Sequence, residues 1–128
     1  QNLFLAAPTV SQHAALAAFT PAARTVFEER RRIFAERRDY LLPALRGLGF
    51  DIPVVPQGAF YLYAGCGRFT DDSFAFCRDL LEEAGVAITP GIDFGEYRAN
   101  AHVRFAYTTS MEELREGVER LRGYLAKR

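Results

Sequence analysis

The sequence predicts an α/β fold with a two-layer α+β arrangement. A small mixed or antiparallel sheet has helices packed on one face, and a long connecting helix precedes it. Three observations predict it. Residues 101–107 alternate apolar and polar side chains, as a half-buried strand does. Apolar side chains recur every seven residues along residues 22–45, as on one side of a helix. After residue 49, the patterns follow the order strand, helix, strand, strand, helix.

Charge and composition exclude several classes of function. Sixteen Lys and Arg residues balance sixteen Asp and Glu residues, so the formal net charge of the 128 residues is zero at pH 7. A neutral chain lacks the positive field that gathers nucleic acid or anionic lipid. No apolar run approaches the ~20 residues that a membrane helix needs. The sequence therefore predicts a chain that neither binds nucleic acid nor enters a membrane.

The first residues and the cysteines bear on the setting of the chain. It starts without Met and without the basic start of a signal peptide, so we expect it to begin as if cut from a longer protein. Cys66 and Cys77 are too few for a disulfide scaffold, and no metal-ligand spacing accompanies the two His residues. We therefore expect no metal site and a cytoplasmic location, with Cys77 in the core.

The chain divides into three predicted parts. Residues 1–19 form an apolar, Ala-rich lead-in segment with a short helix, whose low charge suggests burial against a surface outside these residues. Residues 20–49 form the long connecting helix, with Thr20 as N-cap and Pro21 in the first turn. Pro43 is expected to kink this helix or end it about one turn early. Residues 50–128 form the small domain.

The small domain has its own predicted elements. Strands are expected at 59–63, 86–89 and 101–107, and helices from 73 to 83 and after 110. Several possible N-caps lie within residues 70–73, and Gly85 is expected to stop the first helix. Ser110 and Glu113 have the spacing of a capping box for the last helix.

Arg104 is the candidate functional residue of the strand at 101–107. Val103, Phe105 and Tyr107 fall on the face that the helices should cover, which leaves Arg104 on the other face. A planar guanidinium held on a rigid strand suits a carboxylate bound through two hydrogen bonds. The alternative is an arginine on a solvated face, paired with a passing Glu.

Four segments in order carry a resemblance to a known family. They are PQGAFYLY at 56–63, residues 72–81, GVAITPG at 85–91 with Phe94-Gly95, and VRFAY at 103–107. They resemble the C-terminal part of class I/II aminotransferases, the aspartate-aminotransferase-like enzymes that use pyridoxal phosphate. Residues 1–12 with the Ala-rich helix are similar to the segment after the lysine-bearing region of that family. The resemblance spans essentially the whole chain.

The resemblance implies a function and a set of site residues. The chain would be the small C-terminal domain of a pyridoxal-phosphate-dependent aminotransferase acting on amino acids and 2-oxo acids. Arg104 would bind the substrate α-carboxylate. Phe60, Tyr61 and the loop at 89–91 would close over the substrate, although Phe60 and Tyr61 are equally suited to packing in the core. The family forms homodimers, with the lead-in segment expected at that interface.

Departures from the family limit what the chain does alone. Its one lysine, Lys127, stands next to the end of a charged helix, and no Gly-rich turn opens a helix to hold a phosphate. We therefore expect no catalytic residue, no cofactor-binding residue and no bound pyridoxal phosphate in this chain. The alternative function is a stand-alone amino-acid-sensing or helix-mediated interaction module. Binding of a free amino acid by the chain alone would favour the sensing module.

Overall fold

The structure is a computed structural model that describes residues 6–127 and separates the chain into two compact units, residues 1–33 and 34–128. The first unit holds α1 (Thr9–Ala17) and the first part of α2 (Pro21–Leu48). Thr20 caps α2, because its Oγ1 accepts a hydrogen bond from the amide N of Ala23 at 3.3 Å. Helix α1 has no buried residue. Residues 1–5 of the predicted lead-in segment lie outside the described residues.

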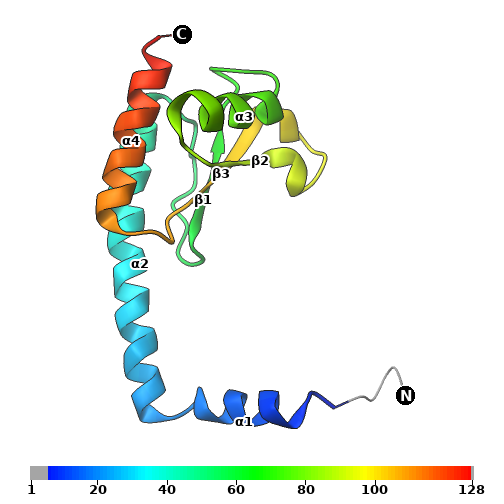
Figure 1. The fold of residues 1–128 in the computed structure, drawn as a ribbon, viewed down its shortest axis with the longest axis vertical. Coiled ribbons are helices and arrows are strands. Elements are labelled where there is room, and N and C mark those ends of the chain that lie inside the picture. Colours follow the sequence, from blue (N-terminus) through cyan, green and yellow to red (C-terminus); the bar gives the residue numbers. More distant parts are fainter. Residues whose placement is uncertain (1–5, 128) are drawn as a thin grey trace. The chain divides into compact units, whose positions relative to one another are not determined.

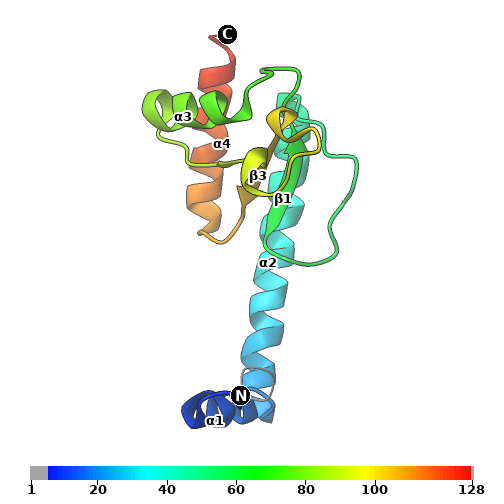
Figure 2. The ribbon, with the colours of Figure 1, turned by 90° about the vertical axis from the view of Figure 1, so that its right-hand side faces the viewer.

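The second unit is the predicted two-layer fold. Its elements after α2 are β1 (Tyr61–Gly65), α3 (Ser73–Ala84), β2 (Thr89–Pro90), the 3₁₀ helices η1 (Gly91–Asp93) and η2 (Ala99–Ala101), β3 (His102–Ala106) and α4 (Met111–Leu125). The strands form a three-stranded antiparallel sheet in the order β1-β3-β2. Figures 1 and 2 show α4 beside the C-terminal part of α2, with the sheet between this pair and the η1–η2 segment. No helix within residues 6–127 is long and apolar enough to cross a membrane.

One face of the sheet forms the core with the helices. Leu62 and Ala64 of β1 and Val103 and Phe105 of β3 alternate with exposed or half-buried neighbours and are themselves buried. The helices contribute buried side chains to the same cluster, among them Leu41, Leu42 and Leu45 of α2, Phe76, Cys77 and Leu80 of α3, and Leu114, Val118 and Leu121 of α4. Burying one such apolar side chain contributes about 1.5–3 kcal/mol. The placement of Cys77 in the core is confirmed.

The ends of the last two helices agree with the sequence. Asp72 is the N-cap of α3, and its carboxylate accepts hydrogen bonds from the amides of Phe74 and Ala75 at 3.0 Å. Gly85 follows α3 in the left-handed conformation (φ 63°), which favours glycine. The capping box of Ser110 and Glu113 at the start of α4 is confirmed.

Helix α2 differs from the prediction at Pro43. The helix does not end there but continues to Leu48. Proline removes one amide hydrogen bond to the carbonyl four residues earlier, which belongs to Asp39. Both residues are exposed, so water can solvate that carbonyl. The packing of Leu45 in the core then holds the last turn in helical form.

Two strands also differ from the prediction. Strand β1 begins at Tyr61 instead of Ala59, because Ala59 has a positive φ of 62°, which interrupts the extended chain. Strand β2 covers Thr89–Pro90 alone, whereas the sequence indicates a strand over 86–89. The amide of Val86 is already used at the end of α3, where it donates to the carbonyl of Leu80 at 3.1 Å.

Candidate functional site

Arg104 lies on the open face of the sheet, opposite the helices. It occupies the middle of the central strand β3 between the buried residues Val103 and Phe105, and it is itself half-buried. The register pairs Arg104 with Tyr63 of β1 on one side and with Thr89 of β2 on the other. Directly paired residues of antiparallel strands share a face. Tyr63, Arg104 and Thr89 therefore form a row across the open face.

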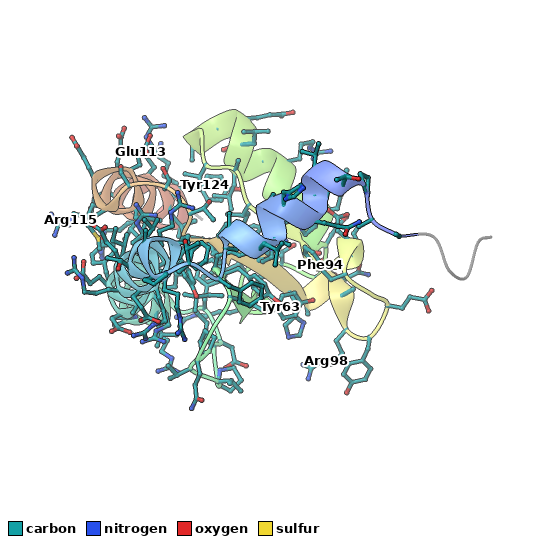
Figure 3. The ribbon with its side chains drawn as sticks, turned by 90° about the horizontal axis from the view of Figure 1, so that it is seen from below. Tyr63, Phe94, Arg98, Glu113, Arg115 and Tyr124 are labelled. Carbon is teal, nitrogen blue, oxygen red and sulfur yellow. The ribbon has the colours of Figure 1, made fainter. Side chains whose placement is uncertain are left out.

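Aromatic rings surround the Arg104 guanidinium. Its central carbon Cζ lies 4.6 Å from the ring centroid of Phe94 and 5.6 Å from that of Tyr61, both within cation–π distance. Tyr61, Tyr63, Phe94 and Arg104 line a cavity of about 460 Å³, which we call the aromatic pocket. Figure 3 shows Tyr63 and Phe94 away from α4, where Glu113 and Arg115 lie.

The guanidinium is incompletely satisfied by the protein. Its Nη2 donates to Thr89 Oγ1 at 3.2 Å, while its buried Nε has no hydrogen-bond partner. Among residues 6–127 no carboxylate forms an ion pair with Arg104. A half-buried charge without a counter-ion has lost part of its hydration, and an anion that joins it replaces the lost interactions. The pocket thus presents unused donors and a positive charge to an anionic group.

Tyr63 forms the second polar group of the pocket. Partial burial raises the pKa of its phenol above the usual value, so the hydroxyl remains protonated at neutral pH. Its ring stacks on His102 at a centroid distance of 5.1 Å and an interplanar angle of 5°. The Nδ1–H of His102 in turn donates to the carbonyl oxygen of Arg98 at 2.8 Å. These contacts fix the Tyr63 ring beside Arg104.

The residues predicted from the sequence lie in different places relative to the pocket. Arg104 and Tyr61 are brought together there. Phe60 precedes β1 and is 45% exposed; its ring lies 5.6 Å from that of Tyr61 and does not line the pocket.

Sequence reasoning missed Tyr63 and Phe94 as site residues, and it named Thr89 only as part of the loop at 89–91 expected to close over the substrate. Tyr63 was detectable, since period two places it on the same strand face as Tyr61. Thr89 and Phe94 required the strand register and the path of the η1 loop, which the residue pattern does not contain.

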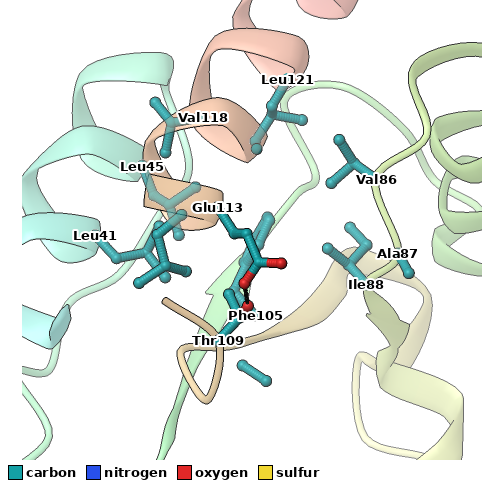
Figure 4. A pocket seen from close by; sticks show the side chains of 13 residues that line it. Leu41, Leu45, Val86, Ala87, Ile88, Phe105, Thr109, Glu113, Val118 and Leu121 are labelled. Atoms are coloured by element: carbon teal, nitrogen blue, oxygen red, sulfur yellow. Dashed lines mark hydrogen bonds between the residues drawn. The ribbon is translucent and has the colours of Figure 1, made fainter. Parts of the chain in front are cut away.

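A second cavity, of about 240 Å³, lies on the helical side of the sheet (Figure 4). Leu41, Leu45, Val118 and Leu121 are among the apolar side chains that line it, and the Glu113 carboxylate lies among them. Hydrogen bonds from Thr109 and Ser110 lower the pKa of Glu113, so this carboxylate is charged at neutral pH. Its charge repels anions, which excludes this cavity as a carboxylate site.

The thiols offer no nucleophile. Burial raises the pKa of Cys66 to about 11 and that of Cys77 to about 12. Neither forms a thiolate at neutral pH, and a thiol is a poor nucleophile.

Comparison with known proteins shows to which family this chain belongs. A sequence model of the family described as aminotransferase class I and II matches residues 1–121. The chain belongs to the class I and II aminotransferase family. The resemblance inferred from the four segments is thereby confirmed, and members of this family are transferases that use pyridoxal phosphate.

Curated aminotransferases are similar along nearly the whole chain. A valine–pyruvate aminotransferase of Mycobacterium tuberculosis is 40% identical over 97% of the chain, which covers 32% of that relative. An aspartate/prephenate aminotransferase of Thermus thermophilus is 40% identical over 93% of the chain and 30% of the relative. The chain spans about a third of the length of the curated aminotransferases that it matches.

Solved aminotransferase structures share the fold. An aminotransferase from Mycobacterium tuberculosis matches with a TM-score of 0.90 at 39% identity, over 99% of this chain and 33% of that one. An aromatic aminotransferase from Pyrococcus horikoshii matches with a TM-score of 0.78 at 32% identity, over 89% of this chain and 30% of that one.

The aminotransferase cofactor does not fit the residues described here. Pyridoxal phosphate is held in aminotransferases through an imine with a lysine amine. The one lysine of this chain, Lys127, follows the end of α4 and lines a cavity with Arg120 and Tyr124 instead of the aromatic pocket. The aromatic pocket supplies a guanidinium and phenols but no amine. We therefore derive no chemical step on the cofactor from these residues.

Proposed function

We propose that the chain is the small C-terminal domain of a pyridoxal-phosphate-dependent aminotransferase and that Arg104 binds the α-carboxylate of amino-acid and 2-oxo-acid substrates. In this proposal residues 1–19 are a remnant of the large domain or interface, residues 20–49 the connecting helix and residues 50–128 the small domain. The observation that supports it most is the half-buried guanidinium, which faces an open pocket in an aminotransferase chain and has no ionic partner among the described residues.

Arg104 performs its part by geometry and charge. A guanidinium donates two parallel hydrogen bonds to the two oxygens of one carboxylate, which fixes both the position and the plane of the substrate. Orienting a substrate in this way lowers the entropic cost of reaction. Tyr61 covers the guanidinium and presents its ring to the substrate. Phe60 remains a predicted substrate contact, supported by its exposed ring beside Tyr61.

The names of the relatives agree with a carboxylate site. Valine and pyruvate, and aspartate and prephenate, appear in the names of two of them. Their side chains differ, but each of these compounds carries a carboxylate next to the carbon that bears its amino or oxo group. We therefore assign carboxylate recognition to this chain and side-chain selection to residues beyond it.

The partner and the location of the enzyme belong to the same proposal. Large apolar side chains of residues 6–33 are exposed, among them Val10, Leu16, Phe19, Val26 and Phe27. Exposed apolar surface of this kind is typical of an interface, so the proposed homodimer places it there. The two buried cysteines are free, which supports the proposed cytoplasmic location.

Replacement of Arg104 by lysine tests the proposal in the full-length enzyme. Lysine keeps the positive charge but cannot donate two parallel hydrogen bonds. We expect the KM for the amino-acid substrate to rise roughly tenfold or more, since hydrogen bonds to charged groups are worth about 1.5–3 kcal/mol. Because Arg104 faces outward from the core, the thermal midpoint of unfolding should change little.

Arg115→Lys is the matched control. Arg115 is exposed on α4 and also lies over an aromatic ring, that of Tyr40, at 5.8 Å. It lies outside the aromatic pocket, so its replacement should leave KM unchanged. An unchanged KM in Arg104→Lys would refute the assignment of the α-carboxylate to Arg104.

A further inference from the structure

The Arg104 guanidinium has one hydrogen-bond partner, Thr89, among the described residues. Nη2 donates to Thr89 Oγ1 at 3.2 Å. Thr89 stands directly opposite Arg104 in the β2–β3 register, and both side chains are half-buried. The acceptor therefore belongs to the neighbouring strand of the same sheet face, and its position is set by backbone pairing.

Two features of the chain restrict the position of the Thr89 hydroxyl. Threonine is branched at Cβ, which restricts its first side-chain torsion. The next residue, Pro90, has a fixed φ (−69°) and pairs with Val103 in the same ladder. A hydroxyl carries one proton and two acceptor lone pairs. While Thr89 Oγ1 accepts the hydrogen bond from Arg104, the hydroxyl proton has no acceptor in the described part of the chain. The hydroxyl can therefore donate a hydrogen bond to a ligand.

The aromatic rings leave the rotation of the guanidinium to Thr89. Phe94 and Tyr61 lie over the group at 4.6 and 5.6 Å and hold it by its face. Such contacts restrain the plane of the cation but not the direction of its N–H groups within that plane. The hydrogen bond to Thr89 is the directional contact.

We propose that Thr89 is a positioning residue for the carboxylate: its hydroxyl fixes the in-plane orientation of the Arg104 guanidinium and donates a hydrogen bond to the same carboxylate. This inference rests on the proposed function of Arg104. An oriented guanidinium loses less side-chain freedom when the carboxylate binds. Thr89 thus acts on substrate affinity and not on the chemistry of amino transfer.

Two substitutions separate the hydroxyl from the rest of the side chain. Thr89→Val keeps the size and branching and removes the hydroxyl, whereas Thr89→Ser keeps the hydroxyl and removes the methyl group. The probe is the L-amino acid that reacts fastest with the full-length enzyme in a screen of the standard amino acids. We expect Thr89→Val to raise its KM roughly threefold to tenfold, as for loss of one hydrogen bond of ordinary net strength, with kcat little changed. Thr89→Ser should restore most of the affinity.

A double-mutant cycle with Arg104→Lys identifies the partner of the hydroxyl. If Thr89 acts through Arg104 as well as on the carboxylate, Thr89→Val should raise KM by a smaller factor in the Arg104→Lys enzyme than in the wild type. Purely additive effects, or a Thr89→Ser enzyme as impaired as Thr89→Val, would overturn the positioning role. A high KM in Arg104→Lys with a normal KM in Thr89→Val would refute the role of Thr89 and leave the proposed function standing. A normal KM in Arg104→Lys itself would refute both.

Discussion

Arg104 differs from the surface arginines of the same chain in what surrounds it. Arg31 pairs with Glu28 at 2.7 Å, yet 74% and 67% of the two side chains are exposed, and such pairs are worth at most about 1 kcal/mol. Arg104 has no such pair in residues 6–127 and is instead flanked by two rings and one hydroxyl. Its partial burial lowers the local dielectric, which strengthens the attraction of the guanidinium for a carboxylate.

Gly91, next to Tyr63 of the aromatic pocket, is a position where the addition of a single methyl group should destabilise the fold. A Cβ on Gly91 would lie 2.8 Å from both the carbonyl oxygen of His102 and the hydroxyl of Tyr63, and closer still to the carbonyl of Ala99. Backbone oxygens cannot move aside cheaply. We therefore expect Gly91→Ala to lower the free energy of unfolding by about 1–3 kcal/mol, the usual cost of overpacking. Urea denaturation of the chain measures this change.

Gly58→Ala is the control for the same substitution in a loop. Nothing lies within 4 Å of a Cβ placed on Gly58, so we expect stability to change by no more than about 0.5 kcal/mol. Equal stabilities of the Gly91 and Gly58 variants would show that the close packing beneath Tyr63 is not rigid.

At the scale of elements, the sequence predicted helices better than strands. The caps at Asp72, Gly85 and Ser110 are local interactions, so the residues that make them are adjacent in the sequence. Strands depend on partners far along the chain. The short extent of β2 follows from the use of the Val86 amide by α3, which the pattern of residues 86–89 does not reveal.

The residues of the candidate site likewise fall into those that the sequence predicts and those that depend on the fold. Arg104 and Tyr61 were predictable, because alternation along a strand and the family motifs point to them. The contribution of Thr89 and Phe94 depends on the pairing of β2 with β3 and on the fold of the loop after β2. These are tertiary features, set by packing and not by the spacing of residues.

The capping box of α4 predicts a specific dependence of stability on pH. Hydrogen bonds from Thr109 and then from the amide and hydroxyl of Ser110 lower the pKa of Glu113 in the folded state. The contribution of the carboxylate is therefore present above its unfolded pKa of about 4.3 and is lost as the pH falls through the lower folded value. We expect the chain to lose stability on acidification partly through this residue.

Glu113→Gln isolates that contribution, because glutamine keeps the capping hydrogen bonds and does not titrate. The measurement is the urea midpoint of both chains at neutral pH and below the glutamate pKa. The variant should be less stable than the wild type at neutral pH, and the two should converge in acid. Parallel pH profiles would show that the lowered pKa makes no contribution to stability.

At the scale of the whole molecule, the proposed function makes the open face of the sheet one wall of a substrate site. The helices complete the core on one side of the sheet, while the aromatic pocket on the other side holds a charge that the described residues do not neutralise. The chain spans about a third of its curated relatives, and the cofactor-binding lysine of the family has no counterpart in the pocket. The division of labour that we infer places carboxylate recognition here and amino transfer elsewhere in the enzyme.

The most direct test of that division compares two substrates in the full-length enzyme. One is the fastest-reacting L-amino acid and the other the primary amine with the same side chain and no carboxylate; the quantity is the ratio of their kcat/KM values. If Arg104 binds the carboxylate, Arg104→Lys should lower this ratio roughly tenfold or more, because only the amino acid loses an interaction. A ratio equal to that of the wild type would contradict the account.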